Sequence, residues 1–143
     1  MSLIVDASVV VKWFVRENLH DEALKLLDKH AGDLEAPDFL FMEVANVAWK
    51  KTVRHEITPD HARAIPVAAR EFITVLHPSV DLVPRAMEIA LLLDHPVYDC
   101  QYLACAEAVD GIVVTADKRF VHAVEGTEFS SRVAFLGEDM PGQ

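Results

Sequence analysis

Cysteine, glycine and basic residues are all scarce in this sequence, and none of its apolar runs is long. The 143 residues include two cysteines and five glycines, and 13 lysines and arginines stand against 23 aspartates and glutamates. The few glycines and the 52% hydrophobic content exclude a disordered chain. No apolar run approaches about 18 residues, so no transmembrane helix is expected, and the N-terminus lacks the features of a cleaved signal peptide. We therefore expect one domain over residues 1–143, in the cytoplasm and without a membrane anchor.

The cysteines, the histidines and the net charge indicate which kinds of binding site to expect. Cys100 and Cys105 are five residues apart on an expected helix, so they point to different sides and are not expected to pair. None of the seven histidines stands in an H-x-x-x-H pattern, and no C-x-x-C occurs, so a zinc site is not expected. The net charge of −10 argues against general attraction to nucleic acid and favours acidic groups that attract cations.

Short apolar segments alternate with longer helical patterns along the chain. Strands that are separated by helices need crossover connections, which predict a three-layer α/β/α fold around a central, mostly parallel sheet of four to five strands. The expected strands are 3–6, 74–79, 112–115 and 132–137, the last at an edge of the sheet. The expected helices are 7–15, 20–31, 38–55, 58–73, 81–94, 98–110 and one that begins at Asp117 or Lys118.

Five local signals mark where these elements begin, bend and end. Thr58 and Asp81 are expected helix caps, and Gly111 is expected to close the helix over 98–110. Pro66 is expected to kink or divide its helix. The segment Ala36-Pro37-Asp38 is interpreted as a break before the helix over 38–55.

Two aspartates follow apolar strand candidates in the same way. Asp6 ends the run "LIVDAS", and Asp117 ends the run "IVVTAD". An aspartate at the end of a strand often marks no more than the point where the strand meets water. In parallel α/β sheets, however, ligands bind beyond the carboxyl ends of the strands. We therefore expect both carboxylates at the edge where such a fold places its active site.

Two further acidic residues stand in unusual surroundings. Glu43, Asn46 and Lys50 form one polar stripe on an otherwise apolar helix that we expect to be mostly buried. A stripe that faces solvent would explain the same pattern. Asp99 falls in the first turn of its helix, where a negative charge is favourable by a few tenths of a kcal/mol and needs no other explanation.

If these four carboxylates converge, their repulsion needs a cation. Two like charges about 4 Å apart repel by about 4 kcal/mol at an effective dielectric constant near 20. Ligands that are all oxygen, with no histidine or cysteine, suit Mg²⁺ or Mn²⁺. Such an ion supports the hydrolysis of phosphodiesters. Ser8, Asn46 and Thr115 lie near the acidic residues in sequence, and their hydroxyl and amide groups are expected to orient the ligands.

The order of these motifs resembles the PIN-domain ribonucleases and, within them, the VapC-type toxins of toxin–antitoxin pairs. The similarity runs over about residues 3–136, and its motifs are "IVDAS", "MEVANV", "YDCQYLACAE" and "VVTADKRF". The resemblance implies a PIN-like fold and an acidic quartet of Asp6, Glu43, Asp99 and Asp117. It also implies that Asp6 and Asp99 hold Mg²⁺ directly, while Glu43 and Asp117 complete the pocket and help to position ions or water. A cognate antitoxin that covers the active site and a homodimer are further implications.

The basic residues raise the question of how an acidic protein approaches RNA. Lys118 and Arg119 directly follow Asp117 and are expected to contact the RNA backbone near the pocket. Lys51 and Arg54 are interpreted as ordinary solvated side chains. The weak overall attraction favours a structured RNA that is recognised by its shape.

Three other functions compete with the nuclease. A phosphotransferase of the haloacid-dehalogenase type needs a second aspartate at the position of Ser8, and a receiver domain needs an acidic pair at the first strand. The third is a catalytically silent PIN-like module that only binds RNA or protein, which the complete quartet disfavours.

Overall fold

Five parallel strands form one sheet at the centre of the molecule, in the order β3-β2-β1-β4-β5. The structure is a computed structural model that describes residues 2–140, so Met1 and residues 141–143 of the predicted domain lie outside the described part. The strands are β1 (Leu3–Val5), β2 (Leu34–Pro37), β3 (Val75–His77), β4 (Ile112–Thr115) and β5 (Val133–Phe135). β1 is central and pairs with both β2 and β4. β5 lies at an edge, as predicted.

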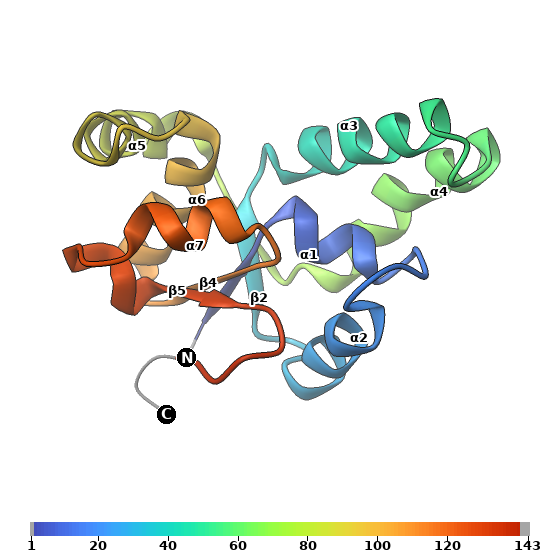
Figure 1. Cartoon of the computed structure of the whole chain (residues 1–143), viewed down its shortest axis with the longest axis horizontal. Coiled ribbons are helices and arrows are strands. Elements are labelled where there is room, and N and C mark those ends of the chain that lie inside the picture. The colour runs from blue at the N-terminus through green and yellow to red at the C-terminus, as the bar shows by residue number, and fades with distance from the viewer. Residues whose placement is uncertain (1, 141–143) are drawn as a thin grey trace.

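Helices cover both faces of this sheet, which confirms the three-layer α/β/α fold. They are α1 (Ala7–Lys12), α2 (His20–Lys29), α3 (Leu40–Val53), α4 (Pro59–Ala69), α5 (Ser79–Leu93), α6 (Val97–Val109) and α7 (Lys118–Val124). The blue to green helices α1–α4 lie on one side, and the yellow to orange helices α5–α7 lie on the other (Figure 1). Right-handed crossovers produce this division, because the chain moves one way across the sheet from β1 to β3 and the opposite way afterwards. Within residues 2–140, no helix combines the length and apolarity that crossing a membrane requires.

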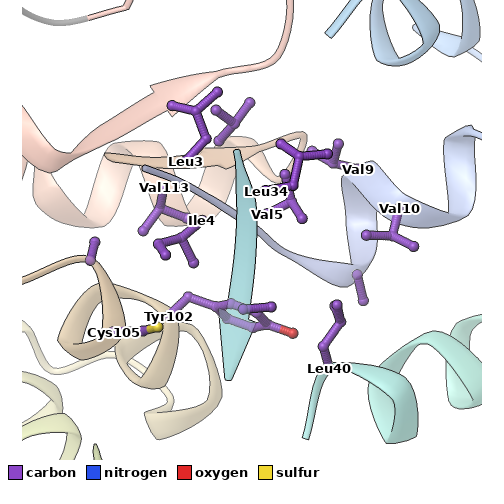
Figure 2. Packing of buried hydrophobic residues seen from close by; sticks show 14 of the residues in the cluster. Leu3, Ile4, Val5, Val9, Val10, Leu34, Leu40, Tyr102, Cys105 and Val113 are labelled. Atoms are coloured by element: carbon purple, nitrogen blue, oxygen red, sulfur yellow. The ribbon is translucent and has the colours of Figure 1, made fainter. Parts of the chain in front are cut away.

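The central strands are apolar and buried, as strands covered on both faces must be. Every residue of β1 and of β4 is buried. Figure 2 shows Ile4 on the side of the sheet where Tyr102 and Cys105 of α6 lie, and Val5 near Val9 of α1. This alternation along β1 anchors α1 and α6 to opposite faces, and both helices begin at the carboxyl end of the sheet.

The main difference from the sequence prediction is β2. The segment that was interpreted as a break forms a strand, Leu34–Pro37, and α3 begins at Leu40 rather than at 38. Four residues that include a glutamate and a proline give no alternating pattern. Pro37 is tolerated because it is the last residue of the strand, where the ladder no longer needs its missing N–H. The helices α1 and α2 are also shorter than expected and end at Lys12 and Lys29.

The predicted local signals had mixed outcomes. Thr58 caps α4 by accepting the His61 N–H at 3.1 Å, as expected. Pro66 does not divide this helix, which absorbs the missing N–H and continues to Ala69. The expected cap Asp81 lies inside the first turn of α5, and Asp38 instead accepts the N–H of Ser79.

The end of α6 and the surface of α3 also depart from expectation. Asp110, with φ 53°, adopts the left-handed conformation that ends α6, so Gly111 is not needed for it. Position 111 needs a glycine for a different reason: there is no room for a side chain, because a Cβ there would lie 2.5 Å from the carbonyl oxygen of Ser2. α3 is not mostly buried: Met42 and Trp49 are 76% and 58% exposed.

Replacing Gly111 tests how closely β4 must approach the start of β1. We expect Gly111→Ala to lower the free energy of unfolding by about 1–3 kcal/mol, because the added methyl group forces the two strands apart. Gly126→Ala is the control, since a Cβ there meets nothing within 4 Å and only its φ of 73° is unfavourable for alanine, at about 1 kcal/mol. Urea denaturation measures both. An equal loss in the two variants would contradict the steric explanation.

Candidate active site

Asp6 and Asp117 lie beyond the carboxyl ends of the adjacent strands β1 and β4. Asp6 follows β1 directly and caps α1 by accepting the Val9 N–H at 3.2 Å. Asp117 lies two residues beyond β4 and caps α7 by accepting the Arg119 N–H at 2.9 Å. Each aspartate therefore joins a strand to a helix, and the parallel pairing of the two strands brings the two junctions to the same edge.

One cavity of about 280 Å³ joins these two carboxylates to Glu43 and Asp99. Glu43 comes from the first turn of α3 and Asp99 from the first turn of α6. The four predicted acidic residues thus come from four separate parts of the chain and line the same hollow. Tyr102 lies one helical turn after Asp99 and also lines it.

The Asp6 carboxylate is buried, and each of its two oxygens accepts at least one hydrogen bond. Ser8 donates its hydroxyl to Oδ1 at 2.5 Å, and Thr115 of β4 donates to Oδ2 at 2.5 Å. The pKa of Asp6 is raised to about 7, because burial, with a smaller contribution from the nearby Asp99, outweighs the lowering effect of the two hydroxyl groups and the Val9 N–H. Without a positive charge in the cavity, the ionised form of this side chain is therefore costly.

Glu43 is held by a buried tyrosine from the opposite layer of helices. The Tyr102 hydroxyl donates to Glu43 Oε1 at 2.6 Å. Figure 2 shows the ring reaching from α6 towards the start of α3, with its oxygen pointing away from Cys105. Burial and the neighbouring carboxylates hold the pKa of Tyr102 well above its ordinary value, so it stays a donor. Burial also raises the pKa of Glu43, while this hydrogen bond lowers it.

Asp99 has a partner that the sequence reasoning missed. His95 Nε2 lies 2.6 Å from Asp99 Oδ2, and the imidazole stacks on Phe120 with ring centroids 5.8 Å apart. Burial raises the pKa of Asp99, the contact with His95 lowers it, and Asp117 raises it. His95 lies in the loop between α5 and α6. Its spacing of four residues from Asp99 is the signal in the sequence that could have identified the pair.

Of the other predicted site residues, some lie against the carboxylates and others lie outside the cavity. Ser8 and Thr115 both contact Asp6, as described above. Asn46 is exposed and does not line the cavity; with Lys50 and Glu43 it lines a separate depression on α3. The Lys118 ammonium lies 5.9 Å from the ring centroid of Phe135. Arg119 is 89% exposed, with its Nε 3.5 Å from Asp117 Oδ1, and neither of these two basic residues lines the cavity.

Two lysines that were not assigned to the site do line the cavity. Lys12 of α1 and Lys51 of α3 both pair with Glu17, which lines it as well. The Lys51 side chain is only 13% exposed, so its interpretation as an ordinary solvated lysine is wrong. Periodicity alone could not reveal this, because the partner Glu17 lies 34 residues away in sequence.

The donor chemistry of the cavity fits a hard divalent cation. All four acidic side chains offer oxygen only, and burial raises the pKa of three of them, Asp6, Glu43 and Asp99, so a cation would favour their ionised forms. In the part of the chain that the structure describes, no group of three or more histidine, cysteine, aspartate or glutamate side chains is arranged so that it could hold a metal ion. The carboxylates thus share one cavity without already being drawn together around a single point.

The pKa of Asp6 predicts how the stability of the metal-free protein depends on pH. Since the pKa lies near 7 in the folded chain and near 3.8 otherwise, the folded state retains a proton that the unfolded state releases. Stability is therefore lost as pH rises from about 4 to about 7, by several kcal/mol at about 1.4 kcal/mol per unit. We expect Asp6→Asn to unfold at a higher temperature than the wild type at pH 8 in EDTA, and this advantage to vanish near pH 4.

Thermal unfolding at several pH values measures this difference. Asp81→Asn is the matched control, because Asp81 is exposed on α5 outside the cavity. A wild-type stability that does not change between pH 4 and 7 would contradict the assigned burial of the charge.

Comparison with known proteins extends the sequence resemblance. The PIN domain family matches residues 3–126. Ribonuclease VapC3 of Pyrobaculum aerophilum is 31% identical over 121 residues, which cover 83% of this chain and 92% of the relative. Among solved structures, PAE2754 from Pyrobaculum aerophilum matches with a TM-score of 0.66 at 20% identity, over 89% of this chain and 82% of that one. A toxin–antitoxin complex from Klebsiella pneumoniae matches with a TM-score of 0.69 at 17% identity, over 96% and 100% of the two chains.

These similarities agree with the resemblance that the motifs predicted. The two solved structures share the fold with this chain, and the curated relative shares both length and sequence with it. The family match over residues 3–126, together with a relative that is 31% identical over most of both chains, shows that this chain belongs to the PIN-domain family.

Proposed function

We propose that this chain is an endoribonuclease that depends on Mg²⁺, or on Mn²⁺ in its place, and hydrolyses RNA phosphodiester bonds. The observation that carries the proposal is the single cavity lined by Asp6, Glu43, Asp99 and Asp117 at the carboxyl edge of a parallel sheet. A relative that is named a ribonuclease supports RNA as the substrate.

In this proposal Asp6 and Asp99 hold the ion directly, while Glu43 and Asp117 complete its surroundings and help to position water. When bound, such an ion lowers the pKa of a coordinated water and neutralises charge on the phosphate oxygens. Burial and the neighbouring acidic groups already raise the pKa of Asp6 and Asp99, so both gain from a positive charge beside them.

The chain itself supplies orientation to three of the four carboxylates. Asp6 is held by Ser8 and Thr115, Glu43 by Tyr102, and Asp99 by His95, at donor–acceptor distances of 2.5–2.6 Å. These partners fix the carboxylate oxygens before a substrate arrives, which is how groups around a metal site set its geometry. Asp117 is more exposed, and within residues 2–140 its carboxylate contacts the backbone N–H and the guanidinium group of Arg119. We therefore place it at the mouth, with Lys118 and Arg119 available to the RNA backbone.

We also propose that the protein is the toxin of a toxin–antitoxin pair in the cytoplasm, neutralised by a cognate antitoxin, and that it forms a homodimer. The Klebsiella pneumoniae neighbour is a toxin–antitoxin complex, which supports the toxin role. Exposed apolar side chains support an interface: Val80, Val83, Met87 and Leu91 form one stripe on α5. Trp49 of α3 is also exposed, whereas Trp13 is buried in the core.

The alternative function is a PIN-like module that binds RNA or protein without turnover. The same fold and cavity would serve it, so only a measurement of catalysis separates the two. Retention of all four carboxylates in one cavity favours turnover, because a binding module has no need to bury Asp6 at the cost described above.

Cleavage of RNA by the purified protein tests the proposal. We expect hydrolysis that requires Mg²⁺ or Mn²⁺ and stops in EDTA. Asp6→Asn and Asp99→Asn should each lower the rate at least about a hundredfold, since each removes a direct ligand. Asp81→Asn, which alters an exposed carboxylate outside the cavity, should retain the wild-type rate. Cleavage that persists in both folded cavity variants would overturn the assignment, and a wild type that binds RNA without cleaving it would support the silent module.

The tyrosine that holds Glu43 offers a second test of the same site. We expect Tyr102→Phe to lower the cleavage rate about tenfold to a hundredfold, because Glu43 loses the donor that orients it. The other tyrosine, Tyr98, is exposed, so Tyr98→Phe removes the same atom without touching this contact and should stay within about twofold of the wild type. Single-turnover kinetics measure the two variants. Equal rates in both would show that the hydrogen bond has no part in catalysis.

A further inference from the structure

The cavity has a basic end that the proposed chemistry does not use. On α3, Glu43, Val47 and Lys51 follow one another at intervals of four residues and all line the cavity. On α1, Ser8 and Lys12 are related in the same way. Residues four apart share one face of a helix, so both helices present a polar group near the carboxylates and a lysine one or two turns further on. The cavity therefore changes from acidic to basic along its length.

The two lysines are held in the cavity wall rather than spread into solvent. Lys12 Nζ lies 3.2 Å from Glu17 Oε1, and Lys51 Nζ bonds to Glu17 Oε2. Both lysine side chains are 13% exposed, whereas the Lys25 side chain on α2 is 74% exposed. Lysine is rarely buried without a specific reason.

Charge and hydrogen-bonding capacity are left over at this end. Among the side chains that line the cavity, Lys12, Lys51 and Glu17 together carry one net positive charge. Glu56 also pairs with Lys51 at 3.4 Å, but it lies outside the cavity and its side chain is 46% exposed, so solvent screens its charge. An ammonium group has three donors, and among the described side chains Lys12 uses one of them, on Glu17.

Stability alone does not explain this arrangement. Ion pairs that retain solvent contact contribute little, while ordering two lysines costs side-chain entropy. A ligand with negative charge would use both the surplus charge and the remaining donors. The acidic end repels such a ligand, so the lysine end is the part of the cavity where an anionic group is attracted.

We propose that Lys12 and Lys51 form a phosphate-binding subsite that takes a backbone phosphate next to the one at the carboxylates, with Glu17 as the positioning residue that holds the two ammonium groups. The assignment of the phosphate to RNA rests on the proposed ribonuclease function. The subsite accounts for how a chain with a net charge of −10 binds a polyanion: the attraction is local and lies inside the cavity.

Binding of a cleavage-resistant RNA tests the subsite without requiring catalysis. The probe is a random-sequence pool of fluorescent 2′-O-methyl oligoribonucleotides, and anisotropy is measured in Mg²⁺ over a series of KCl concentrations. We expect Lys12→Gln and Lys51→Gln each to weaken binding about tenfold and to reduce the slope of log affinity against log salt by about 0.7, the value for one lost contact to a single strand. Lys25→Gln, the matched control on an exposed lysine, should change neither quantity.

Glu17→Gln separates the subsite from a purely structural role. An amide at this position keeps an oxygen for the lysines but removes the charge that offsets them, so we expect tighter binding, opposite in sign to the lysine variants. If the three residues only stabilise the fold, all three variants will lower the unfolding temperature and leave the affinity of the folded protein unchanged, which would overturn the subsite. A wild type that does not bind the probe would overturn it as well.

The two proposals fail in different ways. If the lysine variants show the expected loss of binding but the wild type does not cleave natural RNA, the subsite stands and the ribonuclease proposal fails. If the wild type cleaves RNA and the lysine variants keep its KM and its affinity, the ribonuclease proposal stands and the subsite fails.

Discussion

The carboxylate of Asp6 is the point at which the sheet, the helices and the cavity depend on one another. It caps α1, receives a hydroxyl group from that helix through Ser8, and receives a second one from the end of β4 through Thr115. Those hydroxyl groups in turn accept the backbone N–H groups of Ala116 and Asp117. One buried acidic group therefore fixes how β1 meets β4 and where Asp117 stands. Burying the Asp6 carboxylate costs free energy, but the same hydrogen bonds hold the ends of β1 and β4 in place at the carboxyl edge.

Charge is distributed along the cavity so that one end repels anions and the other end attracts them. The carboxylate end disfavours anions unless a cation is present, and burial raises the pKa of Asp6, Glu43 and Asp99 there. The opposite end holds two lysines on one glutamate, whose own pKa is lowered by them despite its partial burial. A negative overall charge and a polyanionic substrate are thus compatible, since field strength inside a cleft depends on the nearest groups rather than on the net charge.

The sequence predicted those features that depend on local pattern and on the general geometry of parallel sheets. Asp6 and Asp117 could be placed at one edge because each follows an apolar strand, and the start of α6 located Asp99. β2 was missed because four residues with a glutamate and a proline resemble a turn. Ser8 and Thr115 were predicted to orient the acidic ligands, and both contact Asp6. The partner of Lys51 was inaccessible, because its burial depends on Glu17, which is distant in sequence. The exposure of α3 was missed because an apolar side chain need not be buried.

The distance in sequence between Asp6 and Thr115 has a consequence for when the site comes into existence. The two residues are 109 positions apart, and β1 obtains its second neighbouring strand only from the same distant segment. Because the N-terminal part of a chain leaves the ribosome first, Asp6 emerges long before the group that holds it. A truncated or unfinished chain therefore has no assembled carboxyl edge. Translation must pass β4 before the cavity can form, so the four carboxylates come together only after most of the chain has been synthesised.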